Sequence, residues 1–347
     1  MKTEIRDLSL EELKKEMVYM GEPAHRAGQI FLWLNRKNAY SFKSMTNLPK
    51  SLVPKLEKRY VIGKLHCEEH LVSKDGTEKL LWRLKDGERI ETVLIRQKKR
   101  RTLCLSTQAG CRFKCPFCAS GLKGFVRDLS VSEILNQVFL AQEICKCRVT
   151  NIVFMGMGEP LDNYNNLVRS IRLINHPSGL AIGARKITVS TCGIVPGILK
   201  LKEIGLQIEL SVSLHAANNT LRNELVPVNR RYPLEALISA CKEYYETTGR
   251  VITLEYTLIS GRNDSLKEAE RLAKIAKELK AKINLITCNP FAERAYGAPD
   301  RKSITLFREK LRGRGATVTV RRPRGRDILA ACGQLAAGFA REKENGQ

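Results

Sequence analysis

The last two thirds of the chain alternate short apolar runs with longer amphipathic stretches, and this alternation restricts the fold more than any other feature. The runs that we expect to be strands are 103–107, 152–155, 187–190, 208–214, 252–258, 283–286 and 317–320. The first intervening stretch begins at Ser130, where Glu133 three residues later completes a helix-capping pattern. Strand–helix repetition of this kind predicts an α/β fold with a parallel sheet or barrel. Functional groups in such folds gather at the carboxyl ends of the strands.

The remaining segments are expected to flank this core. Residues 1–60 predict a small helical N-terminal accessory domain, and residues 61–96 predict a short β meander or linker. Residues 97–327 then make up the predicted core barrel. Residues 328–347 follow as a C-terminal extension that carries Cys332.

The charge of the chain indicates a polyanionic partner. Lys and Arg number 60 against 36 Asp and Glu, which gives a net charge of +24. RNA or DNA is the usual partner of so basic a protein. Basic runs at 98–101, 230–231 and 321–326 are expected near the mouth of the barrel, although any single run could be an ordinary solvated face.

The sequence predicts a cytoplasmic protein with reduced thiols. It has no apolar stretch long enough for a membrane helix. Its first residues are charged, unlike a secretory signal. The 11 cysteines are therefore expected to be metal ligands, catalytic thiols or small core residues, rather than a disulfide framework.

Three of these cysteines, Cys111, Cys115 and Cys118, lie within eight residues. A structural zinc site normally has four protein ligands, usually as two separated pairs, and the sequence has no second such pair. Three thiolates on an iron–sulfur cube leave one iron open to a substrate. CxxxCxxC is the motif of radical S-adenosylmethionine (SAM) enzymes, in which the open iron chelates SAM.

Polar and glycine-rich groups follow several of the predicted strands. The turn 156–160 resembles the Gly-Gly-Glu-Pro motif of the radical SAM superfamily, whose glycines let the backbone approach the amino group of SAM. Other polar groups stand at the ends of the next strands, where a cofactor rim would need them. Each of them taken alone could be a strand cap, and the lone thiols Cys104 and Cys332 could each be small core residues.

Taken together, these segments resemble the RlmN/Cfr family of radical SAM RNA methyltransferases, over about residues 5 to 340. The resemblance is carried by the runs 103–111, 154–164, 189–191, 213–216 and 331–335. It implies a radical SAM partial (βα)6 barrel, one [4Fe-4S] cluster on the cysteine triad, and two SAM molecules per turnover. The SAM contacts that it implies are Gly158, Glu159, Ser190, Ser213, Leu214, His215 and Asn289.

The same resemblance assigns catalytic roles to three residues. Cys332 corresponds to the thiol that receives a methyl group, and Cys104 to the thiol that resolves the protein–RNA crosslink by forming a disulfide. Glu91 matches the glutamate that accepts a proton. RlmN-like enzymes methylate C2 of adenine 2503 in 23S rRNA and C2 of adenine 37 in tRNA, whereas Cfr methylates C8 of the same rRNA adenine.

The chain departs modestly from the family pattern at Val126, Asp128 and Cys288, which bears on RNA preference rather than on the type of reaction. The partners that the resemblance implies are 23S rRNA, tRNA and a reducing protein such as flavodoxin, and a monomer is expected.

A different class also fits the charge: a non-catalytic RNA-binding protein with a structural zinc ion or cluster. That class predicts four closed ligands and no cleavage of SAM.

Overall fold

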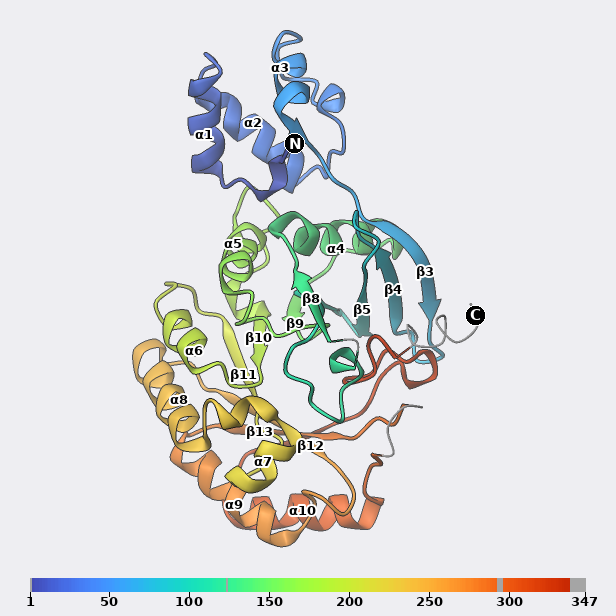
Figure 1. Cartoon of the computed structure of the whole chain (residues 1–347), viewed down its shortest axis with the longest axis vertical. Coiled ribbons are helices and arrows are strands. Elements are labelled where there is room, and N and C mark those ends of the chain that lie inside the picture. Colours follow the sequence, from blue (N-terminus) through green and yellow to red (C-terminus); the bar gives the residue numbers. More distant parts are fainter. Residues whose placement is uncertain (1, 123, 292–295, 338–347) are drawn as a thin grey trace.

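A single curved sheet forms the centre of the molecule (Figure 1). The computed structural model describes residues 2–122, 124–291 and 296–337. The sheet has ten strands in the order β14-β13-β12-β11-β10-β9-β6-β5-β4-β3. Strand β6 and strands β9 to β14 are parallel, whereas β3 to β6 pair antiparallel. The bounds are β3 His66–Val72, β4 Glu78–Arg83, β5 Arg89–Gln97, β6 Arg100–Cys104, β9 Asn151–Phe154, β10 Ile187–Thr191, β11 Glu209–Ser213, β12 Thr253–Leu258, β13 Lys282–Thr287 and β14 Val318–Arg321.

Helices connect the parallel strands and cover the outer face of the sheet (Figure 1). They are α4 Val131–Ile144, α5 Tyr164–Asn175, α6 Val195–Leu201, α7 Asn219–Leu225, α8 Leu234–Thr248, α9 Leu266–Glu278 and α10 Arg301–Gly313. Helix α4 begins with the predicted capping box, in which Ser130 Oγ accepts from Glu133 N and the Glu133 carboxylate accepts from Ser130 N. The predicted α/β class with a parallel, partly closed barrel is confirmed, and the sheet stays open because β3 and β14 are its two edges.

One predicted strand was placed too late in the sequence. The run 103–107 was expected, but β6 begins at Arg100 because the basic residues before it pair with β5, with Arg101 opposite Arg96. This also corrects the expected place of the basic run 98–101. It forms the turn into β6 at the amino end of that strand, and it approaches the carboxyl edge only through a groove that it shares with Arg324.

The chain before the sheet is mainly helical and lies at the end of the molecule opposite α9 and α10 (Figure 1). It contains α1 Leu10–Tyr19, α2 His25–Asn35, α3 Leu52–Arg59 and the short strands β1 Thr3–Glu4 and β2 Tyr60–Val61. Arg6 joins it to the barrel. This side chain is buried, and its guanidinium donates to Asn136 Oδ1 of α4 at 2.6 Å and to Ala39 O at 2.8 Å.

Short elements complete the chain. The hairpin β7 Gln108–Gly110 and β8 Phe125–Asp128 frames the cysteine triad. The 3-10 turns are η1 Ile5–Asp7, η2 Phe42–Ser44, η3 Ala119–Gly121, η4 Ala184–Lys186, η5 Pro227–Arg230 and η6 Arg326–Ile328. Within the described ranges, no helix has both the length and the apolar character that a membrane span requires.

Candidate active site

A cavity of about 930 Å³ opens at the carboxyl ends of the parallel strands. Its wall combines the cysteine triad with polar groups from four strand ends, as the sequence predicted. Of the predicted residues, those that line it are Cys111, Cys115, Cys118, Gly158, Glu159, Ser190, Ser213, His215, Asn289 and Cys332. The lining does not include three of the predicted residues, which are Cys104, Glu91 and Leu214.

The cysteine loop is held by the hairpin that encloses it. Cys111 N donates to Gly124 O at 2.9 Å, and a β-carbon on Gly110 would come within 1.8 Å of that same oxygen. Only glycine fits at position 110, which also has a φ of 76°. The turn that follows is closed by a bond from Cys118 N to Cys115 O at 3.0 Å.

The triad fits the open-iron cluster that its spacing predicts. No disulfide engages the three thiols, and all three face one cavity from a single loop. Burial raises the pKa of Cys111 to about 12 and also raises that of Cys118, so both need a cation to become thiolates. An iron–sulfur cluster supplies that charge, and the remaining cavity leaves room for a ligand on the open iron.

Glu159 is fixed rigidly beside the triad. Its carboxylate accepts from Cys192 N at 2.7 Å and from Leu161 N at 3.0 Å, while its own backbone N donates to Gln108 Oε1. Burial raises the pKa of this carboxyl despite the two backbone donors. Gly158 allows this geometry, because a β-carbon there would lie 2.5 Å from Gln108 Cβ.

The next two strand ends share a carboxylate that the sequence analysis missed. Ser190 Oγ donates to Glu255 Oε2 at 3.0 Å and lies 3.3 Å from Ser213 Oγ. Glu255 is buried on β12 and lines the cavity. Its signal in the sequence was a single carboxylate within the otherwise uncharged strand Thr253–Leu258.

His215 is held as a neutral imidazole. Its Nδ1 accepts from Thr257 N at 3.0 Å, its ring packs edge-on to Phe117 at 4.9 Å, and burial lowers its pKa to about 3. Leu214, just before it, is buried and contributes through its backbone, because its N donates to Glu255 O at 3.0 Å.

A buried arginine that sequence reasoning also missed ties these strand ends together. Arg222 on α7 has no exposed surface. Its guanidinium donates to Cys192 O at 2.6 Å, to Leu214 O at 3.2 Å and to Asn229 Oδ1 at 2.9 Å. It therefore connects the ends of β10 and β11 and places a fixed positive charge behind the cysteine loop. Its signal in the sequence was slight, because a lone arginine in a helix is usually exposed.

Cys332 and Cys104 meet in a second cavity of about 520 Å³. Cys332 is exposed and lines both cavities, whereas Cys104 is buried at the end of β6. Burial, followed by the charge of the neighbouring Cys332, raises the pKa of Cys104 to about 12. Arg321 lines the same cavity, and the proximity of Cys332 raises the pKa of its guanidinium. The fold thus brings together two thiols that are far apart in the sequence.

The turn that carries Cys332 is fixed by hydrogen bonds from other segments. Asn289 Nδ2 donates to Cys332 O at 3.0 Å, and Arg326 Nε donates to Asn289 Oδ1 at 2.7 Å. Ala119 N, just after the cysteine triad, donates to Gly333 O at 2.7 Å. Asn289 therefore reaches both the large cavity and the Cys332 turn.

The chain matches two family models that follow one another along the sequence. Residues 3–62 match the ribosomal RNA large subunit methyltransferase N-terminal domain, and residues 105–290 match the radical SAM superfamily. A protein of Bacillus anthracis described as a probable dual-specificity RNA methyltransferase RlmN is 47% identical over 345 residues, which are 99% of this chain and 95% of the relative. The chain belongs to the RlmN family.

Further comparisons agree with this membership. A protein of Geobacillus kaustophilus with the same description is 46% identical over 342 residues, or 98% of this chain and 94% of that protein. A crystal structure of a radical SAM methyltransferase from Sphaerobacter thermophilus is 44% identical and superposes with a TM-score of 0.92. It covers 96% of this chain and 99% of that one.

Glu91 of this RlmN-family protein lies on β5 behind the C-terminal turn. The carboxylate is buried, forms an ion pair with buried Lys79 at 2.8 Å, and accepts from Ala336 N at 2.7 Å. In this position it anchors the segment that follows Cys332. Its role as a proton acceptor stays a prediction.

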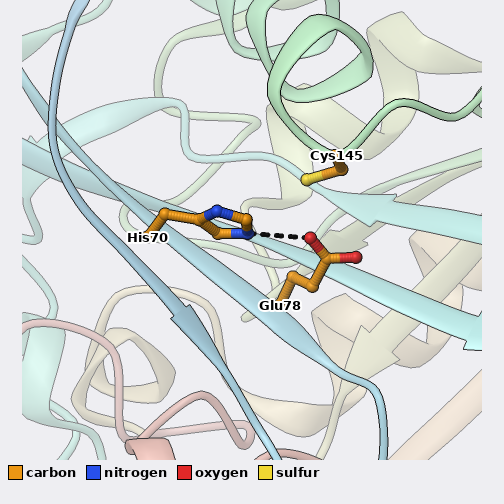
Figure 2. A group of neighbouring side chains, drawn as sticks. All are labelled: His70, Glu78 and Cys145. Atoms are coloured by element: carbon orange, nitrogen blue, oxygen red, sulfur yellow. Dashed lines mark hydrogen bonds and ion pairs between the residues drawn. The ribbon is translucent and has the colours of Figure 1, made fainter.

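A separate group of His70, Glu78 and Cys145 has ligand atoms that all lie within 4.8 Å of one another (Figure 2). His70 Nε2 lies 2.8 Å from Glu78 Oε2, and Arg96 Nε donates to Glu78 Oε1 at 2.7 Å. Arg96 also donates to Cys145 O. Because the Arg96 guanidinium already neutralises the carboxylate, we interpret the group as a salt-bridged clamp between β3, β4, β5 and the end of α4.

Proposed function

We propose that this chain methylates C2 of adenine 2503 in 23S rRNA, and also C2 of adenine 37 in tRNA, through a methyl group carried on Cys332. The observation that supports this most strongly is the position of Cys332, which lines the cavity of the cysteine triad and also the cavity of Cys104. The dual-specificity description of the relatives supports two RNA substrates.

Cys111, Cys115 and Cys118 would hold one [4Fe-4S] cluster. SAM would contact the strand ends at Gly158, Glu159, Ser190, Ser213, Leu214, His215 and Asn289. When bound, the cluster supplies the electron that cleaves SAM reductively. Two SAM molecules are used per turnover, one as methyl donor and one for this cleavage.

The chain's own thiols carry out the transfer. The Cys332 thiolate takes a methyl group from the first SAM, favoured by the nearby Arg321 guanidinium. The 5′-deoxyadenosyl fragment of the cleaved SAM would take a hydrogen atom from this methyl group, and the carbon would then bond to adenine C2. The C2 proton would pass to Glu91 and the odd electron to the oxidised electron carrier, which leaves the RNA joined to Cys332 through one carbon. Cys104 then attacks the Cys332 sulfur, the bond between that sulfur and the transferred carbon breaks, and the carbon takes up a proton to become the methyl group. Methylated RNA is thereby released and a Cys104–Cys332 disulfide remains. A reducing system must reopen this disulfide before the next turnover.

Glu91 is the proposed acceptor of the C2 proton. Lys79 neutralises the carboxylate in the resting protein, and the bond from Ala336 N keeps it beside the Cys332 segment. The adenine has to leave its stack to enter the barrel. Contacts between its phosphates and basic side chains such as Arg321 and Arg324, which line the cavity of Cys104 and Cys332, offset part of that cost.

Mass spectrometry of digested 23S rRNA and tRNA, from cells with and without this protein, tests the proposal. We expect 2-methyladenosine at both RNA positions only when the protein is present. Finding 8-methyladenosine in the rRNA would instead identify Cfr-like chemistry, and finding no methylated adenosine would overturn the proposal.

A further inference from the structure

We infer that a groove beside the cysteine loop is the docking site of a small acidic electron-carrier protein, separate from the surface that receives RNA. The inference rests on the proposed function, because a cluster on the triad needs one electron from outside for each SAM that it cleaves. The groove has a volume of about 840 Å³ and adjoins the cysteine loop, the starts of α5 and α6, and the chain before α8.

The groove presents more positive than negative charge. Arg112, Lys200 and Arg231 line it and are all exposed, whereas Asp162 is the one lining carboxylate within the part of the chain that the structure describes. Asp162 is already engaged, since Arg112 Nε lies 2.6 Å from its Oδ2. Among the residues that the structure describes, Lys200 and Arg231 form no ion pair. Two cations therefore remain available to carboxylates of a partner.

Aromatic side chains provide the contact surface between these charges. Lys200 Nζ lies 5.8 Å from the ring centre of Tyr164, and the Arg231 guanidinium lies 5.2 Å from that of Tyr232. Both tyrosines are half-buried, so they are held in place while their outer edges stay accessible. Tyrosine and arginine are enriched at protein–protein interfaces for this combination of rigid apolar area and polar ends.

Phe113 connects the groove to the iron site. It lines both the groove and the large cavity, and it stands two residues from Cys111 and two from Cys115. It also packs with Cys115 and Cys192 on one small apolar cluster, against which Tyr232 packs too. A carrier seated in the groove would thus be separated from the cluster by a single layer of side chains, which suits electron transfer because its rate falls steeply with distance.

The RNA has a different route to the reacting thiols. A second basic groove, of about 980 Å³, is lined by Arg96, Lys98, Lys99, Arg100 and Arg324, among others. Arg324 also lines the cavity of Cys104 and Cys332. That groove shares no lining residue with the groove at Phe113. We therefore assign RNA to the groove beside the thiol pair and the carrier to the groove at Phe113.

The electron transfer needs no reactant other than the carrier and the cluster. The reduced carrier loses one electron, the oxidised cluster gains it, and no bond is made or broken in this step. A protein with an acidic face around a flavin or an iron–sulfur centre meets these requirements, and flavodoxin serves as the probe. Flavodoxin kept in its one-electron-reduced or hydroquinone form would donate in the same way.

The test compares two charge reversals in the full-length, cluster-loaded protein. Lys200→Glu with Arg231→Glu alters the proposed docking groove, and Lys98→Glu with Lys99→Glu is the matched control in the other groove. Flavodoxin affinity, the rate of cluster reduction by flavodoxin in stopped flow, and RNA affinity are measured for each. Reduction by dithionite, which needs no docking, reports whether the cluster site is intact.

We expect the Lys200/Arg231 variant to lose about tenfold or more in flavodoxin affinity and reduction rate at low ionic strength, with the difference shrinking in high salt. Its reduction by dithionite and its RNA affinity should match the wild type, whereas the control variant should lose RNA affinity alone. Unchanged flavodoxin affinity would overturn the inference. A loss of RNA affinity as large as the loss for flavodoxin would also overturn it, by making this groove an RNA surface. Failure of dithionite to reduce even the wild type would instead count against the proposed function.

Discussion

The cysteine loop and the Cys104–Cys332 pair are two groups of thiols assembled in opposite ways. The loop draws its three thiols from eight consecutive residues, and local features such as Gly110 fix its shape. The pair comes from the end of β6 and from a turn near the C-terminus, joined only through the fold. The geometry of the first group should therefore tolerate substitutions far from the loop. The geometry of the second group depends on the contacts that hold the Cys332 turn.

The largest expected effect is the loss of the cluster, which should follow substitution in the cysteine loop but not in the Cys104–Cys332 pair. Cys115→Ala should abolish the iron content, the visible absorbance of the cluster and all SAM cleavage, because two remaining ligands cannot retain the cluster. Cys332→Ala should keep the iron and the absorbance while losing all RNA methylation. Iron analysis and absorbance after anaerobic reconstitution check both. Loss of the cluster in the Cys332 variant would show that Cys332 is a cluster ligand, and the two groups of thiols would then not have separate roles.

The next effect concerns the ion pair behind the C-terminal turn. Lys79→Met leaves the buried Glu91 carboxylate without its counter-charge, so we expect a loss of roughly 3–5 kcal/mol in the free energy of unfolding. The double variant Lys79→Met with Glu91→Leu should recover most of this loss, since no buried charge is left. Urea unfolding measures both. Equal destabilisation in the single and the double variant would refute the account.

A smaller effect of pH is expected at His215. The pKa of His215 is about 3 in the folded protein, below its ordinary value of 6.5, because burial disfavours the imidazolium. As the pH falls below 6.5, the unfolded chain takes up the proton first, so stability is full above that pH and declines toward pH 3. Between pH 7 and 5 the wild type should lose about 2 kcal/mol more than His215→Asn. If the free energy of unfolding fell equally with pH in the wild type and in His215→Asn, His215 would not be held neutral.

The smallest effect sharpens how the thiol pair is positioned. Arg326 touches neither thiol but orients Asn289, which holds Cys332 O. Arg326→Ala should slow methylation of Cys332 by about tenfold at saturating SAM, because the methyl acceptor is less well placed. The iron content should stay unchanged, and Arg326→Lys should recover only part of the rate. Mass spectrometry of the protein follows the methylated thiol, and an unchanged rate in Arg326→Ala would remove this positioning role.

The sequence alone was informative where the determinants are local. The strand–helix alternation gave the fold class, and the spacing of Cys111, Cys115 and Cys118 gave the triad, since both depend on neighbouring residues. The boundary of β6 was missed because its first residues are arginines whose place in the sheet depends on pairing with β5.

The functional residues that were missed depend on tertiary contacts. Arg222 and Glu255 are charged residues buried by elements far away in the sequence, and nothing in their immediate neighbours indicates that burial. The partnership of Cys104 and Cys332 came only from family resemblance, because periodicity and spacing leave each as an isolated thiol.

The most direct test of the central claim is turnover by the Cys104→Ala variant with RNA. If one thiol carries the methyl group and the other releases the product, this variant should keep its cluster, methylate Cys332, and accumulate RNA covalently attached to the protein. Mass spectrometry of the nuclease- and protease-digested adduct should then place an adenosine, joined through one carbon, on Cys332. Release of methylated RNA at the wild-type rate, with no adduct, would contradict the account.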